Sequence, residues 1–184
     1  MKTFFSWIKR IFTAALVTTS TAVHSEVLDS QDVIHLDVEY GRIVIKLRPD
    51  LAPMHVDRIK ELSNSGFYDG APWHRVIEGF MAQTGDPKNG NGTGGSHLPD
   101  LPAEFNEGQH VRGALSMARA GNPNSANSQF FIVLDDAPHL NGQYTYFGQV
   151  IEGMDFVDQI RKGNPADNGA VVYPDRIVQM QVAK

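Results

Sequence analysis

The feature that most constrains the fold is a series of short segments in which apolar and polar residues alternate. Residues 33–38, 42–47 and 176–182 each carry an apolar side chain at about every second position. This is the pattern of a β-strand with one buried face. A turn at residues 39–41 joins the first two segments and predicts a β-hairpin with Ile43, Ile45 and Leu47 on one face.

The rest of the chain adds more strands and few helices. We predict two strand arms within residues 73–86 and single strands at 111–118, 128–134 and 146–151. Helical spacing is found in two segments, 53–62 and 153–162, which are followed by Gly66 and Gly163 as stop signals. About eight short strands with frequent turns favour a closed or nearly closed antiparallel barrel, because closure removes exposed strand edges.

The first 25 residues differ in kind from the rest. Their only charged side chains are Lys2, Lys9 and Arg10, and a mildly apolar stretch and small residues follow. We interpret residues 1–25 as a signal peptide that is cleaved after Ala22 or Ser25, and residues 26–184 as one domain. The alternatives are an uncleaved anchor and a disordered extension. Cleavage predicts a periplasmic or secreted protein with no stable membrane association.

Charge and cysteine content exclude several classes of function. Loss of the three positive charges of the leader takes the formal net charge from −5 to about −8. An acidic domain lacks the basic footprint of a nucleic-acid-binding protein. The chain has no cysteine, so disulfides, thiol nucleophiles and cysteine metal sites are excluded.

The glycine-rich stretch at residues 90–95 has the spacing GxGxxG that is found in dinucleotide-binding loops. That motif needs a helix immediately after it, whose N-terminus binds a pyrophosphate. Pro99 and Pro102 follow instead, so we interpret the stretch as a tight or flexible loop. The seven histidines show no metal-ligand spacing, and no GxSxG nucleophile motif is present. We therefore expect neither a metal nor a cofactor.

One polar pair stands out in the predicted hairpin at residues 73–86, which reads Trp-His-Arg-Val-Ile-Glu-Gly-Phe-Met-Ala-Gln-Thr-Gly-Asp. Arg75 and Gln83 lie there among large apolar residues. Burying a guanidinium is costly unless it is paired. Arg75 either extends to solvent or a carboxylate, as in an ordinary hairpin, or belongs to a functional site.

The motifs of this chain resemble those of the cyclophilin family of peptidyl-prolyl cis–trans isomerases. The hairpin is similar to the family's Phe-His-Arg…Gly-Phe-Met…Gln-Gly-Gly-Asp motif. Further similar blocks follow in the family's order: Asn-Gly-Thr-Gly-Gly at 91–95, Leu-Ser-Met-Ala at 115–118, Asn-Ser-Gln-Phe-Phe-Ile at 127–132 and Phe-Gly-Gln-Val at 147–150. The resemblance spans about residues 32–183. It implies a mainly β fold, an eight-stranded antiparallel closed β-barrel capped by two α-helices.

The resemblance also implies residue roles. Arg75 would be the catalytic residue, donating to the prolyl amide nitrogen of a proline-containing peptide or an unfolded exported protein. The residues that it assigns to substrate binding are Phe80, Met81, Gln83, Gly92, Ala118, Arg119, Ala120, Gln129, Phe131, His139, Leu140 and Tyr144. Of these, Phe80, Met81, Phe131 and Leu140 would line the proline pocket. We expect a monomer that assists the folding of exported proteins.

Three positions depart from the best-known members of the family. His139 stands where many eukaryotic members have Trp, which implies weaker cyclosporin binding. Tyr144 replaces a histidine at the pocket edge, and Arg119 replaces an asparagine whose main chain usually contacts the peptide. These changes affect the expected inhibitor affinity and sequence preference rather than the role of Arg75.

The hairpin raises a geometric question. A two-residue turn at Glu78-Gly79 would place Arg75 opposite Ala82, and strand alternation would then direct Gln83 and Arg75 to opposite faces. Because the resemblance places both residues at one site, we predict a bulge or a wider turn around residues 78–80. Two other functions stay open: a chaperone that binds proline segments with turnover secondary, and a barrel whose pocket is only core.

Overall fold

The computed structural model describes residues 29–184. The expected signal peptide at residues 1–25, with its two cleavage sites, lies outside the described residues. Within residues 29–184, no helix combines the length and apolar character needed to cross a membrane.

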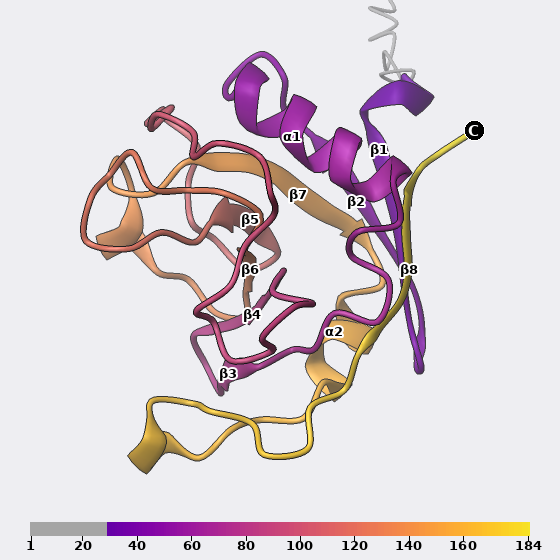
Figure 1. The fold of residues 1–184 in the computed structure, drawn as a ribbon, viewed down its shortest axis with the longest axis vertical. Helices are drawn as coiled ribbons and strands as arrows, with labels where there is room; N and C mark the ends of the chain where they lie inside the picture. Colours follow the sequence, from indigo (N-terminus) through magenta and orange to yellow (C-terminus); the bar gives the residue numbers. More distant parts are fainter. Residues whose placement is uncertain (1–28) are drawn as a thin grey trace, which may run out of the picture.

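One eight-stranded antiparallel sheet forms the body of the molecule (Figure 1). Its strands are β1 (Val33–Val38), β2 (Gly41–Leu47), β3 (Arg75–Ile77), β4 (Met81–Thr84), β5 (Ala114–Met117), β6 (Phe130–Val133), β7 (Tyr146–Glu152) and β8 (Ile177–Val182). Their order in the sheet is β3-β4-β6-β5-β7-β2-β1-β8. The described chain also has two α-helices and three short 3-10 helices, η1 (Ser30–Asp32), η2 (Pro138–Leu140) and η3 (Pro165–Asp167). The mainly β prediction is confirmed, although the strands predicted at 111–118 and 128–134 are shorter than expected.

The expectation of a closed barrel is wrong. Strands β3 and β8 are the two ends of the sheet, which curls into an open half-barrel. An isolated bridge between Pro72 and Arg176, and a 2.9 Å hydrogen bond from the Trp73 N–H to the Asp175 carbonyl, connect the chain across the gap. The Ile177 N–H also donates to the Ala71 carbonyl at 2.9 Å, and the Gly70 N–H to the Ile177 carbonyl at 2.8 Å, but strands β3 and β8 themselves do not pair.

The first hairpin forms where the alternation predicts it, although β2 begins at Gly41, which was expected in the turn. β1 and β2 pair Leu36 with Ile43 and Ile34 with Ile45. The predicted inward residues Ile43, Ile45 and Leu47 are all buried in the main core. Alternation in these strands therefore determines which face of the half-barrel is filled.

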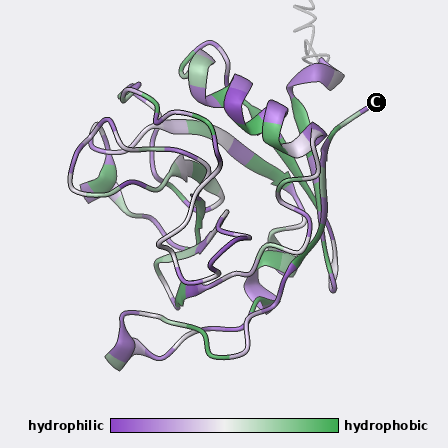
Figure 2. Cartoon of the chain, viewed as in Figure 1, coloured by the Kyte–Doolittle hydropathy of each residue, from purple (hydrophilic) through white to green (hydrophobic). Residues whose placement is uncertain are grey.

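Helix α1 (Pro53–Asn64) packs against β8. Proline occupies its first turn, and Val56, Ile59 and Leu62 are buried on one side, so Figure 2 shows both hydrophobic and hydrophilic positions along it. The Glu104 carboxylate accepts hydrogen bonds from the first N–H groups of the helix, at 3.2 and 3.0 Å. Gly66 follows the helix with φ 73°, which confirms the predicted stop.

Helix α2 (Met154–Gln159) is shorter than the predicted segment 153–162. Ile160 already has extended backbone angles, φ −56° and ψ 131°. Gly163 is not the stop signal: a Cβ there would lie 1.9 Å from the Gly169 carbonyl oxygen. This glycine permits two backbone segments to cross closely, and the chain between α2 and β8 then projects from the body as an arm (Figure 1).

The turn between β3 and β4 is wider than two residues, as predicted. Glu78, Gly79 and Phe80 connect the strands, with Gly79 at φ 67° and a 3.1 Å bond from the Phe80 N–H to the Ile77 carbonyl. In the resulting register Arg75 pairs with Gln83. The two side chains therefore share one face of the sheet.

Candidate active site

Strand β6 divides its side chains between two apolar clusters. Phe130 and Ile132 are in the main core. Phe131 and Val133 point the other way, into a smaller cluster with Met81 and Leu140. Because successive residues of a strand face opposite sides, a fully apolar strand gives the sheet a second hydrophobic surface.

A cavity of about 160 Å³ opens on this second surface. Its lining consists of Arg75, Phe80, Met81, Gln83, Ala118, Arg119, Phe131, Leu140 and Tyr144. All four residues expected to form the proline pocket are therefore brought together with Arg75. Most of the walls are aromatic and aliphatic, and Arg75, Gln83 and Arg119 add polar groups.

Hydrogen bonds fix the Arg75 guanidinium at the cavity wall. Its Nη1 donates to Gln83 Oε1 at 3.1 Å and contacts Met81 Sδ at 3.7 Å. Its Nε and Nη2 donate to the carbonyl oxygen and Oδ1 of Asn168, each at 3.0 Å. Burial lowers the pKa of Arg75 below its usual value, but arginine stays protonated in proteins. No carboxylate among residues 29–184 forms a salt bridge with it, so its charge is uncompensated locally.

A relay of side-chain amides connects Arg75 to the glycine loop. Gln83 Nε2 donates to Gln129 Oε1 at 3.0 Å. Gln129 Nε2 in turn donates to the carbonyl oxygens of Gly92 and Gly94, at 3.0 and 2.7 Å. Each amide uses its donor on one neighbour and its acceptor on the other, which fixes both orientations.

The glycine loop is organised around a buried carboxylate. Asp86 accepts hydrogen bonds from the N–H groups of Asn89, Asn91, Gly92 and Gly94, at 2.9 to 3.3 Å. Burial acts to raise the pKa of Asp86, but these four donors hold it below its usual value of 3.8. No helix follows the loop directly. The backbone N–H groups of this GxGxxG stretch instead bind a carboxylate of the same chain, that of Asp86.

A second, larger cavity of about 380 Å³ adjoins the first and shares Gln83, Ala118 and Arg119 with it. The other predicted site residues Gly92, Ala120 and Gln129 lie in its lining. Every predicted site residue except His139 therefore lines one of the two cavities. A narrow apolar pocket beside a wider polar one suits an extended peptide better than a single small molecule.

The sequence comparisons identify the family. Residues 33–182 match the family model described as "Cyclophilin type peptidyl-prolyl cis-trans isomerase/CLD". This chain belongs to the cyclophilin family. A cyclophilin of this type is an enzyme, a peptidyl-prolyl cis–trans isomerase.

Curated relatives carry the same activity in their names. A "Probable peptidyl-prolyl cis-trans isomerase" of Brucella suis is 54% identical over 164 residues, which cover 84% of each chain. "Peptidyl-prolyl cis-trans isomerase B" of Bacillus subtilis is 45% identical over 125 residues, covering 67% of this cyclophilin and 86% of the relative.

Solved cyclophilins have the same fold. A cyclophilin from Hirschia baltica superposes with a TM-score of 0.75 at 26% identity, covering 84% of this chain and 75% of the other. A cyclophilin-type isomerase from Cryptosporidium parvum, crystallised in the presence of the dipeptide Ala-Pro, gives 0.74 at 29% identity, covering 83% and 99%.

The three positions that depart from well-known cyclophilins cluster at one rim. His139 stacks on Phe80, with ring centroids 5.6 Å apart, and lies outside the cavity lining. Tyr144 lies edge-on to Phe131 at 5.7 Å and forms part of the wall. Arg119 lies over the Tyr144 ring, with Cζ 4.6 Å from its centroid. The rim of this cyclophilin is therefore built from the rings of His139 and Tyr144 and from the guanidinium of Arg119.

Sequence reasoning missed two residues beside the site. Asn168 contacts Arg75 from the arm before β8, and the only local signal was the turn-forming pair Asn168-Gly169. His110 is buried behind Phe131, with ring centroids 6.3 Å apart. Its ring nitrogens lie 2.9 Å from Asn141 Oδ1 and 2.8 Å from Ser116 Oγ. No spacing rule connects these residues, because tertiary contacts alone bring them together.

Proposed function

We propose that this cyclophilin accelerates X-Pro bond rotation without a covalent intermediate, with Arg75 as the catalytic donor to the prolyl amide nitrogen. The planar amide has a rotation barrier of about 18–20 kcal/mol. Uncatalysed isomerisation therefore takes roughly tens to hundreds of seconds.

The chemistry requires stabilisation of a twisted amide. Twisting breaks the amide resonance and localises the lone pair on nitrogen. A donor directed at that nitrogen binds the twisted state more tightly than the planar one, which lowers the barrier. Since no proton is consumed, no general base is needed.

The observation that carries this proposal is the fixed guanidinium at the edge of an apolar cavity. The four contacts of Arg75 leave one of its five N–H groups for a substrate. The apolar walls from Met81, Phe131 and Leu140 can enclose a pyrrolidine ring and lower the local dielectric around the donor.

Proline-containing peptides and unfolded exported proteins are the proposed substrates. The Cryptosporidium relative was crystallised in the presence of Ala-Pro, which supports the peptide class. Export is supported by the basic and apolar N-terminal stretch of the sequence. N-terminal sequencing of the protein recovered from the periplasm or medium tests it: a start at residue 23 or 26 is expected, and a retained Met1 contradicts export by cleavage.

The catalytic role is tested with Arg75→Ala and Arg75→Lys in an isomerase assay on a proline peptide. Loss of a preorganised donor lowers turnover by about 100- to 1,000-fold, and Lys should restore little because it lacks the planar fork. Arg161→Ala, at an exposed arginine outside both cavities, is the matched control. Near-normal turnover of a folded Arg75→Ala protein would refute the mechanism. If that variant lost turnover yet still assisted folding, binding of proline segments would be the more important activity.

A further inference from the structure

Arg119 is a fixed cation on the wall that the two cavities share. Its Nη1 donates to the Ala120 carbonyl at 2.9 Å, and its Nη2 donates to the Gln143 carbonyl at 3.0 Å. The Tyr144 ring lies under the guanidinium, with 4.6 Å between Cζ and the ring centroid. These contacts hold the charged group at one place beside the proline pocket.

The charge of Arg119 has no carboxylate partner among residues 29–184. Each Nη atom carries two hydrogens and donates one of them to a carbonyl. One N–H on each Nη therefore remains for a ligand, and a guanidinium can donate two N–H groups to one carboxylate.

The smaller cavity as a whole is positive. Arg75 and Arg119 both line it, and no Asp or Glu does. The chain carries a net charge of −5, so this wall is an exception on an acidic molecule. Clefts of one sign concentrate ligands of the opposite sign.

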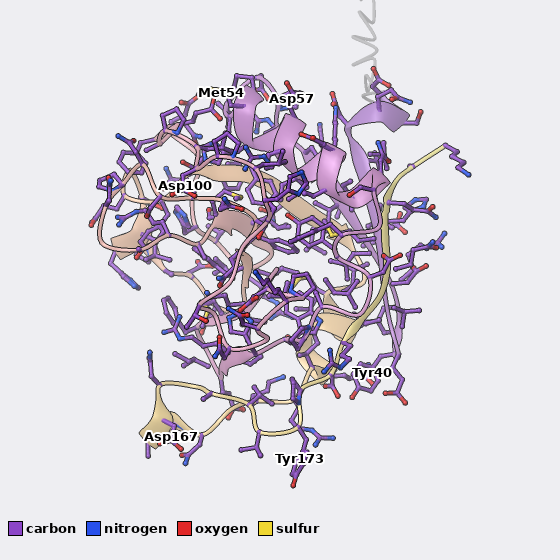
Figure 3. All side chains as sticks on the ribbon, viewed as in Figure 1. Tyr40, Met54, Asp57, Asp100, Asp167 and Tyr173 are labelled. Atoms are coloured by element: carbon purple, nitrogen blue, oxygen red, sulfur yellow. The ribbon has the colours of Figure 1, made fainter. Side chains whose placement is uncertain are left out.

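The larger cavity limits where a ligand carboxylate can lie. Asp100 is in its lining, on the loop before β5 (Figure 3), and accepts a 3.0 Å hydrogen bond from Asn127 Nδ2. Asp100 does not line the smaller cavity. A ligand carboxylate is therefore favoured near the boundary at Arg119 and disfavoured farther into the larger cavity.

We infer that Arg119 makes this isomerase prefer proline segments that carry an acidic side chain within two residues of the proline. When the proline ring occupies the smaller cavity, adjacent residues of the peptide pass the shared wall and reach the free N–H groups. The inference rests on the proline pocket of the proposed function and adds its preferred substrate class.

The test compares peptides that differ only by Glu or Gln at each of the two positions before and after the proline. Exchange rates are measured by NMR without a coupling protease, so peptide charge acts only on the isomerase. We expect kcat/KM to favour Glu by about three- to tenfold at one or more positions at low salt. The ratio should fall towards one at about 0.5 M salt.

Variants assign the preference to its residue. Arg119→Gln should bring the Glu/Gln ratio to about one, Arg119→Glu should invert it, and Arg119→Lys should keep part of it with the same salt dependence. Arg161→Gln removes the same formal charge away from both cavities and should keep the wild-type ratio. Because each variant is judged by its own ratio, a general loss of activity does not imitate the result.

Two results would overturn the preference. One is a ratio of one at every position in the wild type, with normal turnover of the Gln peptides. The other is a wild-type ratio in Arg119→Gln. Absence of turnover with all peptides, Gln included, would instead refute the isomerase pocket itself and with it this inference.

Discussion

Asn168 lies 93 positions after Arg75 in the chain, yet it accepts two hydrogen bonds from the Arg75 guanidinium. One acceptor is its backbone carbonyl and the other is its side-chain Oδ1, each at 3.0 Å. Among residues 29–184, Asn168 is also the one non-glycine residue with positive φ, at 55°. A left-handed backbone at an asparagine is tolerated at a modest cost. The arm between α2 and β8, marked by Asp167 and Tyr173 in Figure 3, therefore supplies a positioning residue for Arg75.

Asn168→Gly should lower kcat by about tenfold while KM changes little. Glycine keeps the left-handed backbone and the carbonyl acceptor, so only the Oδ1 bond to a charged donor is lost. Steady-state kinetics and a thermal melt measure the effect, and the melting temperature should change little. Asn168→Asp keeps a side-chain oxygen that can accept from the Arg75 Nη2, so it is the variant for comparison. A wild-type kcat for Asn168→Gly would show that the side chain does not position Arg75.

Phe131→Ala should weaken substrate binding, because Phe131 forms a wall of the smaller cavity and is only 5% exposed. Truncation of a buried Phe costs about 3 kcal/mol or more of unfolding free energy, so folding is checked by circular dichroism. Phe131→Leu, which keeps more of the packing, provides a milder variant. The measurement is the affinity for a proline peptide. An unchanged affinity in a folded variant would contradict the pocket role.

Asp86→Asn should destabilise the glycine loop. The carboxylate accepts four backbone N–H groups, and an amide replaces one acceptor oxygen with a donor. We expect a loss of about 2–4 kcal/mol in unfolding free energy by urea titration, and a higher KM because Gly92 lines the larger cavity. Asp57→Asn, at an exposed position on α1 (Figure 3), should change stability by less than about 0.5 kcal/mol. Equal effects of the two substitutions would refute the role of Asp86.

Stability should fall as the pH is lowered from 7 to 5. Burial lowers the pKa values of His55, His74 and His110 below their usual 6.5. Below pH 6.5 the unfolded chain therefore binds more protons at these positions than the folded chain, so the unfolding free energy decreases as the pH falls. Hydrogen bonds to Glu104 and Asn141 oppose the shifts at His55 and His110 without reversing them.

Urea titrations at pH 7, 6 and 5 measure this dependence. His110→Gln should reduce its slope, because one titrating group is removed. His97→Gln, at an exposed histidine, is the matched control for the loss of an imidazole. A stability that stays constant from pH 7 to 5 would contradict the prediction.

Alternation and turn chemistry made much of the fold predictable. The β1–β2 hairpin with its buried face and the start of α1 at Pro53 follow from local patterns and are confirmed. The wide turn at residues 78–80 was predicted because the family resemblance places Arg75 and Gln83 at one site, and it is also confirmed. Helix α2 was predicted too long, because the apolar spacing continues to Ile160 although the helix ends at Gln159. The closed barrel was also predicted wrongly, since closure depends on pairing between β3 and β8, two strands far apart in the sequence whose pairing no local pattern reports.

The sequence by itself determined the strand faces, the mainly β class and, through ordered motifs, the family and its activity. These are local properties, because a side chain's face follows from its position in a strand. Only the tertiary structure decided which groups surround Arg75. Asn168 reaches it from a distant segment, and Gln129 holds Gln83 beside it. The smaller cavity forms because β3, β4 and β6 meet the segment after β5 and the segment that contains η2. Contacts of this kind depend on how the whole chain packs, and no short stretch of sequence encodes them.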